Sequence, residues 1–306
     1  MRGDQRMRQF PLTPFIPTMK NILVCTDFSP EAHNAFEVAL QLAKRTGGRV
    51  MLLHVLEEAE GIAGGFSTMG TPTGGHSVDQ IFTIKLLEVT KRRMHALRDE
   101  ATQLAPEVPV QDEVEIARVG DGILHAIHRD HPDLVVMGAR GHGAVENFFV
   151  SSTTERIIRL APCPVLTVKN PHPNFDVRNI VFPSDFAADA ASALDGLRQV
   201  QSDFPNATLH LLHITAGGSG SVAQQQMEAF AQQHHLLNCQ TAEVAAERTS
   251  LGIEEYARNV GADMVVIPTH ARSGLSRFLR TSIAEAVATH AFPPVLTYHL
   301  AQQFDA

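Results

Sequence analysis

Glycine and hydroxyl residues follow one short apolar segment in a pattern that suits phosphate binding. Residues 134–137 are long enough for one buried strand, and Gly138 and Gly141 come soon after them. Four hydroxyl residues, Ser151 to Thr154, then open a segment with helical spacing. Glycine lets backbone N–H groups come close to a ligand, and a helix N-terminus favours negative charge. This strand, loop and helix start therefore indicate an anion site, with phosphate as its natural ligand.

A structural interpretation of the same residue types remains open. Glycine is common in the turns of α/β proteins, and serine and threonine are the usual caps of a helix N-terminus. Asp27, which follows the apolar residues 21–26, can cap the next helix instead of contacting a ligand. Arg140 and His142, inside the glycine-containing loop, fit phosphate neighbours and exposed loop residues equally well.

Histidines provide two further candidate sites. His54 and His213 lie on expected central strands without an acidic or nucleophilic partner, which favours buried structural histidines over catalytic bases. His125, His128 and His131 are spaced three apart, as metal ligands on a helix can be, but no cysteine accompanies them. We therefore assign no catalytic residue and no metal ligand from the sequence.

The elements that carry these residues alternate between strand and helix. Gly47 and Gly48 are expected to end the first helix, which Ser29 caps and Pro30 begins. Such alternation implies a parallel sheet with helices on both faces. In the first half of the chain we expect strands at residues 21–26, 49–56, 112–118, 134–137 and 165–168, with further helices from Ile81 to about 104, after Gly120 and at 155–160.

The second half of the sequence repeats the first. The matches are NILVCTDFS (21–29) with NIVFPSDFA (179–187), VMLLHV (50–55) with LHLLHI (209–214), DLVVMG (133–138) with DMVVIP (263–268), and PCPVLTV (162–168) with FPPVLTY (292–298). Repetition of this kind predicts two homologous domains. We expect a flexible tail or an over-extended start at 1–18, a first domain at 19–170 and a second at 175–306.

The composition argues against several classes of protein. A net charge of −8 argues against general binding to nucleic acid or to anionic membranes. The three cysteines have no metal-like or redox-pair spacing, which suggests a reducing compartment and a cytoplasmic location. No apolar run approaches the roughly 20 residues of a membrane span, and residues 1–18 lack the apolar core of a secretory signal.

The combined pattern resembles the universal stress protein family. An aspartate ends the first strand, LLHV occupies 52–55, and G-x2-G-x9-[GS]-[ST] runs from Gly138 to Ser152. The resemblance covers nearly the whole chain, once per half. It implies two tandem five-stranded parallel sheets of order 3-2-1-4-5, whose ligand would lie at the carboxyl ends of the first and fourth strands. It also implies that the last strands of the two halves pair antiparallel, with a homodimer of the whole chain as a further option.

The resemblance also implies a ligand, ATP with or without Mg²⁺, and the residues that hold it. In ATP-binding members the equivalents of Asp27 and Val55 meet the nucleoside and the adenine. The residues that would hold the phosphates are Gly138, Gly141, Ser151 and Ser152, with Thr153 beside them in the hydroxyl-rich helix start. In those ATP-binding members the last pair is Gly-Ser, so Ser151 stands where they have glycine.

The second half departs further from this pattern. Its corresponding residues are Asp185, Ile214, Pro268, Ala271, Thr281 and Ser282, so both loop glycines are missing. Proline has no N–H and a fixed φ, so Pro268 cannot act as a permissive turn residue in place of Gly138. We expect the second domain to be degenerate and free of nucleotide.

The favoured function is thus a cytoplasmic stress-response protein, a binding module that responds to adenine nucleotide through its first domain. The alternatives are a regulatory or interaction protein that binds no nucleotide, and a slow ATPase. Residues 57–77 are rich in glycine and are expected to form a mobile loop near the adenine pocket.

Overall fold

A computed structural model describes residues 19–57, 76–139, 152–186, 194–215, 221–269, 283–288 and 290–299. The predicted tail at 1–18 lies outside these ranges, as do residues 58–75 of the predicted loop. The last two residues of that loop, His76 and Ser77, already belong to a helix, so the prediction was wrong there. Among the helices that the structure describes, none combines the length and the apolar character needed to cross a membrane.

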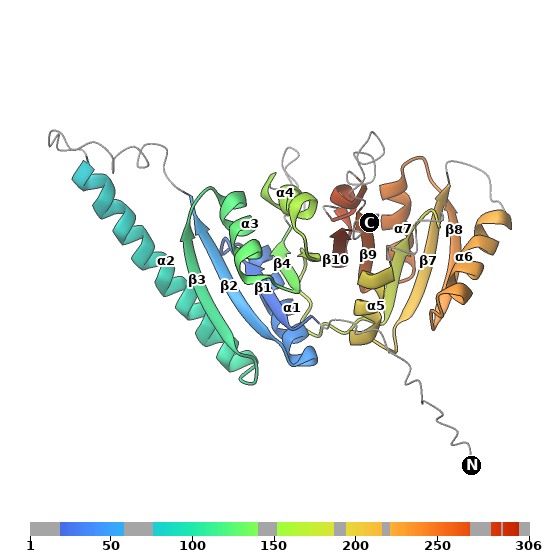
Figure 1. Cartoon of the computed structure of the whole chain (residues 1–306), viewed down its shortest axis with the longest axis horizontal. Helices are drawn as coiled ribbons and strands as arrows, with labels where there is room; N and C mark the ends of the chain where they lie inside the picture. The colour runs from blue at the N-terminus through green and yellow to red at the C-terminus, as the bar shows by residue number, and fades with distance from the viewer. Residues whose placement is uncertain are drawn as a thin grey trace, which may run out of the picture.

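Both halves follow the predicted alternation of strands and helices (Figure 1). The first half contains β1 (Asn21–Cys25), α1 (Pro30–Thr46), β2 (Arg49–Leu56), α2 (His76–Leu104), β3 (Val110–Ile116), α3 (Val119–Asp130), β4 (Leu134–Gly138), α4 (Ser152–Leu160) and β5 (Val165–Val168). The second contains β6 (Asn179–Pro183), α5 (Leu194–Asp203), β7 (Thr208–Thr215), α6 (Ser221–Gln233), β8 (Cys239–Ala245), α7 (Thr249–Asn259), β9 (Met264–Thr269) and β10 (Val295–His299).

Some predicted boundaries were wrong. The third strand lies two residues earlier than predicted, because β3 is an edge strand whose half-buried side chains mark its ends poorly. Three of the hydroxyl residues that we expected ahead of α4, Ser152, Thr153 and Thr154, form its first turn, since the helix begins at Ser152. The ends of α1 are as predicted: Ser29 Oγ accepts a hydrogen bond from Ala32 N at 3.2 Å, and Gly47 closes the helix with φ 65°.

The strands form one continuous sheet of ten, in the order β3-β2-β1-β4-β5-β10-β9-β6-β7-β8. Each half has the predicted order 3-2-1-4-5, and its strands are parallel. The antiparallel pairing of β5 with β10, Leu166 opposite Leu296, confirms the prediction that the last strands meet. Thr167 and Thr297 reinforce it, because each buried hydroxyl donates to a backbone carbonyl of the other strand.

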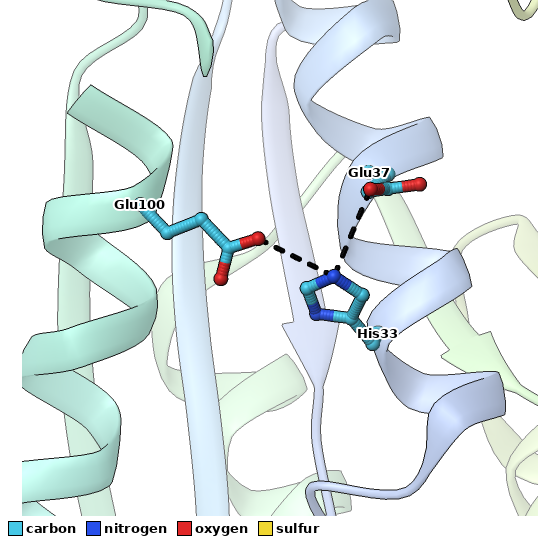
Figure 2. Close-up of side chains that lie close together, drawn as sticks. All are labelled: His33, Glu37 and Glu100. Atoms are coloured by element: carbon cyan, nitrogen blue, oxygen red, sulfur yellow. Dashed lines mark ion pairs between the residues drawn. The ribbon is translucent and has the colours of Figure 1, made fainter. Parts of the chain in front are cut away.

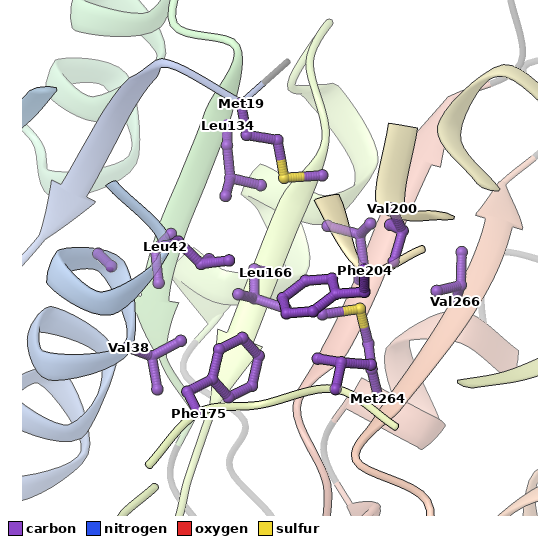
Figure 3. Close-up of a cluster of buried hydrophobic side chains, with 14 of the residues drawn as sticks. Met19, Val38, Leu42, Leu134, Leu166, Phe175, Val200, Phe204, Met264 and Val266 are labelled. Atoms are coloured by element: carbon purple, nitrogen blue, oxygen red, sulfur yellow. The ribbon is translucent and has the colours of Figure 1, made fainter. Parts of the chain in front are cut away.

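Alternating side chains of the strands build a core on each face of the sheet. Ile22 and Val24 of β1 face the layer of α1 and α2, whereas Leu23 and Cys25 face α3 and α4. The α1 and α2 layer continues into the second half around Phe175, part of the segment that joins the halves (Figure 3). The two halves therefore share a core as well as a sheet.

The connecting segment is fastened to α1. Gln41 Nε2 donates to the carbonyl oxygen of His172 at 2.9 Å, and Gln41 Oε1 accepts from Phe175 N at 2.6 Å. The ring of Phe175 meets the ring of Phe204 edge-on, with centroids 6.1 Å apart. These contacts make the connecting segment part of the core and hold α1 near the junction between the halves.

Candidate functional site

The carboxyl ends of β1 and β4 meet at the point where the strand order of the first half reverses. A cavity of about 320 Å³ lies there, which is within the range of small-molecule sites, about 300–1,000 Å³. Its walls come from the ends of β1, β2 and β4 and from the first turns of α1, α3 and α4. The lining residues are Cys25, Thr26, Asp27, Ser29, Glu31, Ala32, Leu53, His54, Val55, Val119, Ile123, Met137, Gly138, Thr153 and Thr154.

Four residues of the predicted site line this cavity: Asp27, Val55, Gly138 and Thr153. Ser152 begins α4 at the same place. Gly141 and Ser151 lie outside the described residues, so the structure says nothing about their position. The fold thus gathers residues that lie far apart in the sequence, while their contact with a ligand stays a prediction.

Asp27 has a local role as well as a place in the cavity. Its Oδ1 accepts a hydrogen bond from Ser29 N at 2.9 Å, so one carboxylate oxygen supports the turn into α1. The residue is exposed and stands at the end of β1. Oδ1 of Asp27 therefore acts as a cap, whereas contact between Asp27 and a ligand stays a prediction.

Gly138 acts differently from the prediction. We expected a permissive turn residue, but Gly138 ends strand β4 and has no positive φ. A Cβ at this position would lie 2.6 Å from Ala32 N and 2.7 Å from the carbonyl carbon of Glu31. Glycine is therefore required here because the first turn of α1 packs directly against the end of β4.

Phe28 is a strained residue that the sequence interpretation missed. Its φ of 62° is in the left-handed region, and Phe186 repeats this with 51° in the second half. For a residue with a side chain this conformation costs roughly 1–2 kcal/mol, and such strain often lies at functional sites. The repeated Thr/Ser-Asp-Phe sequence was the available signal, because Thr26 Oγ1 accepts a hydrogen bond from Phe28 N just as Ser184 Oγ does from Phe186 N.

The conformation of Phe28 places its ring in a stack of three groups. The ring centroid lies 4.6 Å from that of His54, and the guanidinium of Arg93 lies over it at 4.0 Å. His54 Nδ1 is 2.8 Å from the carbonyl oxygen of Thr26, and this contact identifies Nδ1 as the protonated nitrogen. Burial lowers the pKa of His54, so the imidazole is neutral near pH 7.

These contacts support the structural interpretation of the two strand histidines. His213 repeats the arrangement, with Nδ1 3.2 Å from the carbonyl oxygen of Ser184. Cys25 also lines the first cavity, and burial raises the pKa of its thiol to about 12. A protonated thiol is a weak nucleophile, so Cys25 offers no activated nucleophile.

Arg156, which the sequence interpretation also missed, fixes α4 beside the cavity. Its guanidinium pairs with the carboxylate of Asp121 in the first turn of α3. Gly120 makes room for this, because a Cβ there would lie 2.9 Å from Arg156 Nη1. The N-terminal turns of α3 and α4 are thereby held next to each other.

The histidines considered as metal ligands on α3 do not converge. His125 Nδ1 lies 2.8 Å from Glu115 Oε1 of β3, and His131 ends α3 with φ 45°. Within the ranges that the structure describes, a different trio of histidine and carboxylates comes together, formed by His33, Glu37 and Glu100.

The second half has a smaller cavity at the equivalent place, with a volume of about 220 Å³. Asp185, Ile214 and Pro268 line it, whereas Ala271, Thr281 and Ser282 lie outside the described residues. The other lining residues are Pro183, Ser184, Leu212, His213, Thr249, Ile253, Ile267 and Ile283. This cavity is therefore built mainly from aliphatic side chains.

These features define an α/β protein of two fused halves, each with a cavity at the switch point of a 3-2-1-4-5 sheet. The sequence model of the universal stress protein family matches residues 18–169 and again 176–299, and the chain belongs to that family. A universal stress protein of Thermus aquaticus, described by its place in the QAH/OAS sulfhydrylase 3′ region, is 32% identical over 151 residues. The match spans 49% of this chain and 98% of that relative.

Solved structures show the same fold over both halves. A universal stress protein from Archaeoglobus fulgidus DSM 4304 superposes with a TM-score of 0.65 at 15% identity, covering 92% of this chain and 98% of that one. A functionally unknown protein from Pseudomonas aeruginosa PAO1 gives 0.61 at 17% identity, with 92% and 93% covered. The tandem arrangement is thus also present in these proteins.

Proposed function

We propose that this protein is a cytoplasmic stress-response protein whose first half binds an adenine nucleotide, with ATP as the favoured ligand. The observation that carries the proposal is the cavity at the ends of β1 and β4. Four residues chosen from the sequence, Asp27, Val55, Gly138 and Thr153, line it together. Its volume and its position at the switch point suit a nucleotide.

The chemistry of the walls matches the parts of a nucleotide. Leu53, Val55 and Ile123 offer apolar surface for a base. The carboxylate of Asp27 suits the hydroxyls of a ribose, which donate hydrogen bonds to it. The first turn of α4 has backbone N–H groups without helical partners, and these attract phosphate.

The negative charge of the cavity favours binding of Mg²⁺ together with the nucleotide. Asp27 and Glu31 both line the cavity, and two carboxylates would repel the phosphates of bare ATP. A magnesium ion prefers carboxylate and phosphate oxygens and would remove this repulsion. We therefore favour Mg²⁺–ATP over free ATP as the bound species.

A binding module is favoured over an enzyme because no activated nucleophile is evident among the described lining residues. The thiol of Cys25 is protonated, and His54 Nδ1 donates to a backbone carbonyl. A slow ATPase remains the third hypothesis. Phosphate release by the purified chain, above that of a Gly138 and Gly141 double variant, would be required to support it.

The repeat supplies a matched control for the binding test. We expect one equivalent of Mg²⁺–ATP to bind the full chain in calorimetry, and Asp27→Asn to weaken it by about tenfold or more, since a hydrogen bond to a charged group contributes about 1.5–3 kcal/mol. Asp185→Asn makes the same change in the second half and should leave the affinity unchanged.

The possible results separate the hypotheses. Loss of binding in Asp185→Asn alone would move the site to the second half. No binding to the unaltered chain would favour an interaction protein that uses no nucleotide. A homodimer of the full chain would need a surface other than the β5 and β10 edges, because these already pair within one chain.

A further inference from the structure

Three potential metal ligands converge between α1 and α2, outside the cavity described above. His33 and Glu37 lie one turn apart on α1, and Glu100 projects from α2 (Figure 2). His33 Nε2 is 3.3 Å from Glu100 Oε1 and 3.7 Å from Glu37 Oε1. One atom from each residue therefore lies within 4.8 Å of the other two.

The charges of this trio do not balance. Two carboxylates face one imidazole, which carries at most one positive charge. Among the ion pairs of the described residues, no lysine or arginine joins Glu37 or Glu100. Other carboxylates near these helices have such partners: Lys44 lies 2.7 Å from Glu107, and Arg98 lies 2.8 Å from Asp112. The trio thus retains a net negative charge in a half-buried position, where its side chains are 32–40% exposed.

We propose that His33, Glu37 and Glu100 form a binding site for a first-row divalent cation, with Zn²⁺ as the best match. Zinc binds histidine nitrogen and carboxylate oxygen at about 2.0–2.2 Å, so tetrahedral ligands stand roughly 3.3–3.5 Å apart. The observed separations of 3.3 and 3.7 Å are close to this spacing. Mg²⁺ and Ca²⁺ prefer oxygen ligands throughout, so the histidine selects against them.

The surroundings leave room to complete the coordination. A cavity of about 230 Å³ is lined by His33 and Glu100 and also by Phe28 and Arg93. A water molecule or a small anion can therefore occupy the fourth position of a tetrahedral ion. Thr26 and Ala32 line both this cavity and the proposed nucleotide cavity, so the ion would lie close to the start of α1.

The internal repeat predicts one such site per chain. At the positions that match His33 and Glu37, the second half of the sequence has Ala191 and Asp195. The histidine is thus missing there, and only the first half can form this set of ligands. A stoichiometry of one tight equivalent follows.

The test is a titration of the full, untagged and metal-free chain with Zn²⁺ against a chromophoric chelator, without nucleotide. We expect one tight equivalent, which His33→Gln and Glu100→Gln each weaken by more than about 100-fold, since loss of even a supporting residue costs 10–100-fold. His125→Gln is the matched control, because His125 pairs with a single carboxylate, Glu115. It should bind as tightly as the unaltered chain.

Two further measurements make the result unambiguous. Zn²⁺ should raise the thermal midpoint of the unaltered chain and of His125→Gln but of neither ligand variant, because an ion that binds only the folded state stabilises it. Midpoints without metal show whether each variant is folded. Equal binding by all four proteins would overturn the proposal, as would the absence of a tight equivalent in the unaltered chain. Loss of binding only in His125→Gln would move the site to α3.

Discussion

Gly138→Ala is expected to destabilise the protein by about 1–3 kcal/mol, the usual cost of an extra methyl group in a close-packed region. The new Cβ would lie 2.6 Å from Ala32 N, and this neighbour is backbone that cannot turn away. The first turn of α1 must then shift from the end of β4, which moves Ser29 and Asp27. Urea unfolding gives the loss of stability, and Mg²⁺–ATP titration should show weaker binding in the same variant.

Gly120→Ala is the matched control for this prediction. Its Cβ would lie 2.9 Å from Arg156 Nη1, which is the far end of a flexible side chain and can move away. We therefore expect a smaller loss of stability than for Gly138→Ala. Equal losses, or no loss for Gly138→Ala, would contradict the close approach of α1 and β4. Weaker ATP binding without any loss of stability would instead indicate direct contact between residue 138 and the ligand.

Much of the fold could be predicted because the sequence contains the same pattern of strands and helices twice. The paired segments 21–29 and 179–187 identify the first strand of each half, and the alternation of elements then requires a parallel sheet. Asp27 and Gly138 could be placed together because each lies at the carboxyl end of a strand and parallel strands end at one edge. The place of Val55 came from family resemblance. The antiparallel pairing of β5 and β10 came from family resemblance.

Features that depend on packing could not be predicted. The role of Gly138 depends on the distance between α1 and β4, which no local pattern encodes. The left-handed φ of Phe28 was signalled only by the repeated Thr/Ser-Asp-Phe sequence, because one copy alone looks like an ordinary turn. Glu100 approaches His33 only because α1 and α2 pack on the same face of the sheet. The spacing of His125, His128 and His131 instead suggested candidate metal ligands on α3.

The segment between the halves is part of the shared core, since Phe175 is 7% exposed and packs there. The same junction contains a buried carboxylate, Asp203, with 8% of its surface exposed. Composition alone cannot reveal either burial, because both depend on how the second half meets α1.

Asp203→Asn is expected to stabilise the protein above pH 6 and to flatten the dependence of its stability on pH. Burial raises the pKa of Asp203 to about 6, although Arg45 nearby favours the charged form. Its position at the last residue of α5 adds to the cost of the charge, because a helix C-terminus disfavours an anion. Asparagine removes the charge at nearly the same size.

The sign follows from the protons bound in each state. An unfolded aspartate has a pKa of about 3.9, so between pH 4 and 6 the folded chain holds a proton that the unfolded chain has lost. Stability contributed by this proton is present at low pH and is lost as the pH rises through about 6. Two pKa units correspond to about 3 kcal/mol, and we expect Asp203→Asn to gain about 1–3 kcal/mol at pH 8.

Asp176→Asn provides the control at the same junction. Asp176 is 47% exposed and lies 2.9 Å from the same Arg45, so its removal should change stability by less than about 1 kcal/mol. Urea unfolding of both variants and the unaltered chain at pH 5 and pH 8 measures the difference directly, and groups titrating elsewhere cancel in the comparison. An equal pH slope in Asp203→Asn and the unaltered chain, or a loss of stability at pH 8 in the variant, would mean that the folded chain accommodates the charged carboxylate.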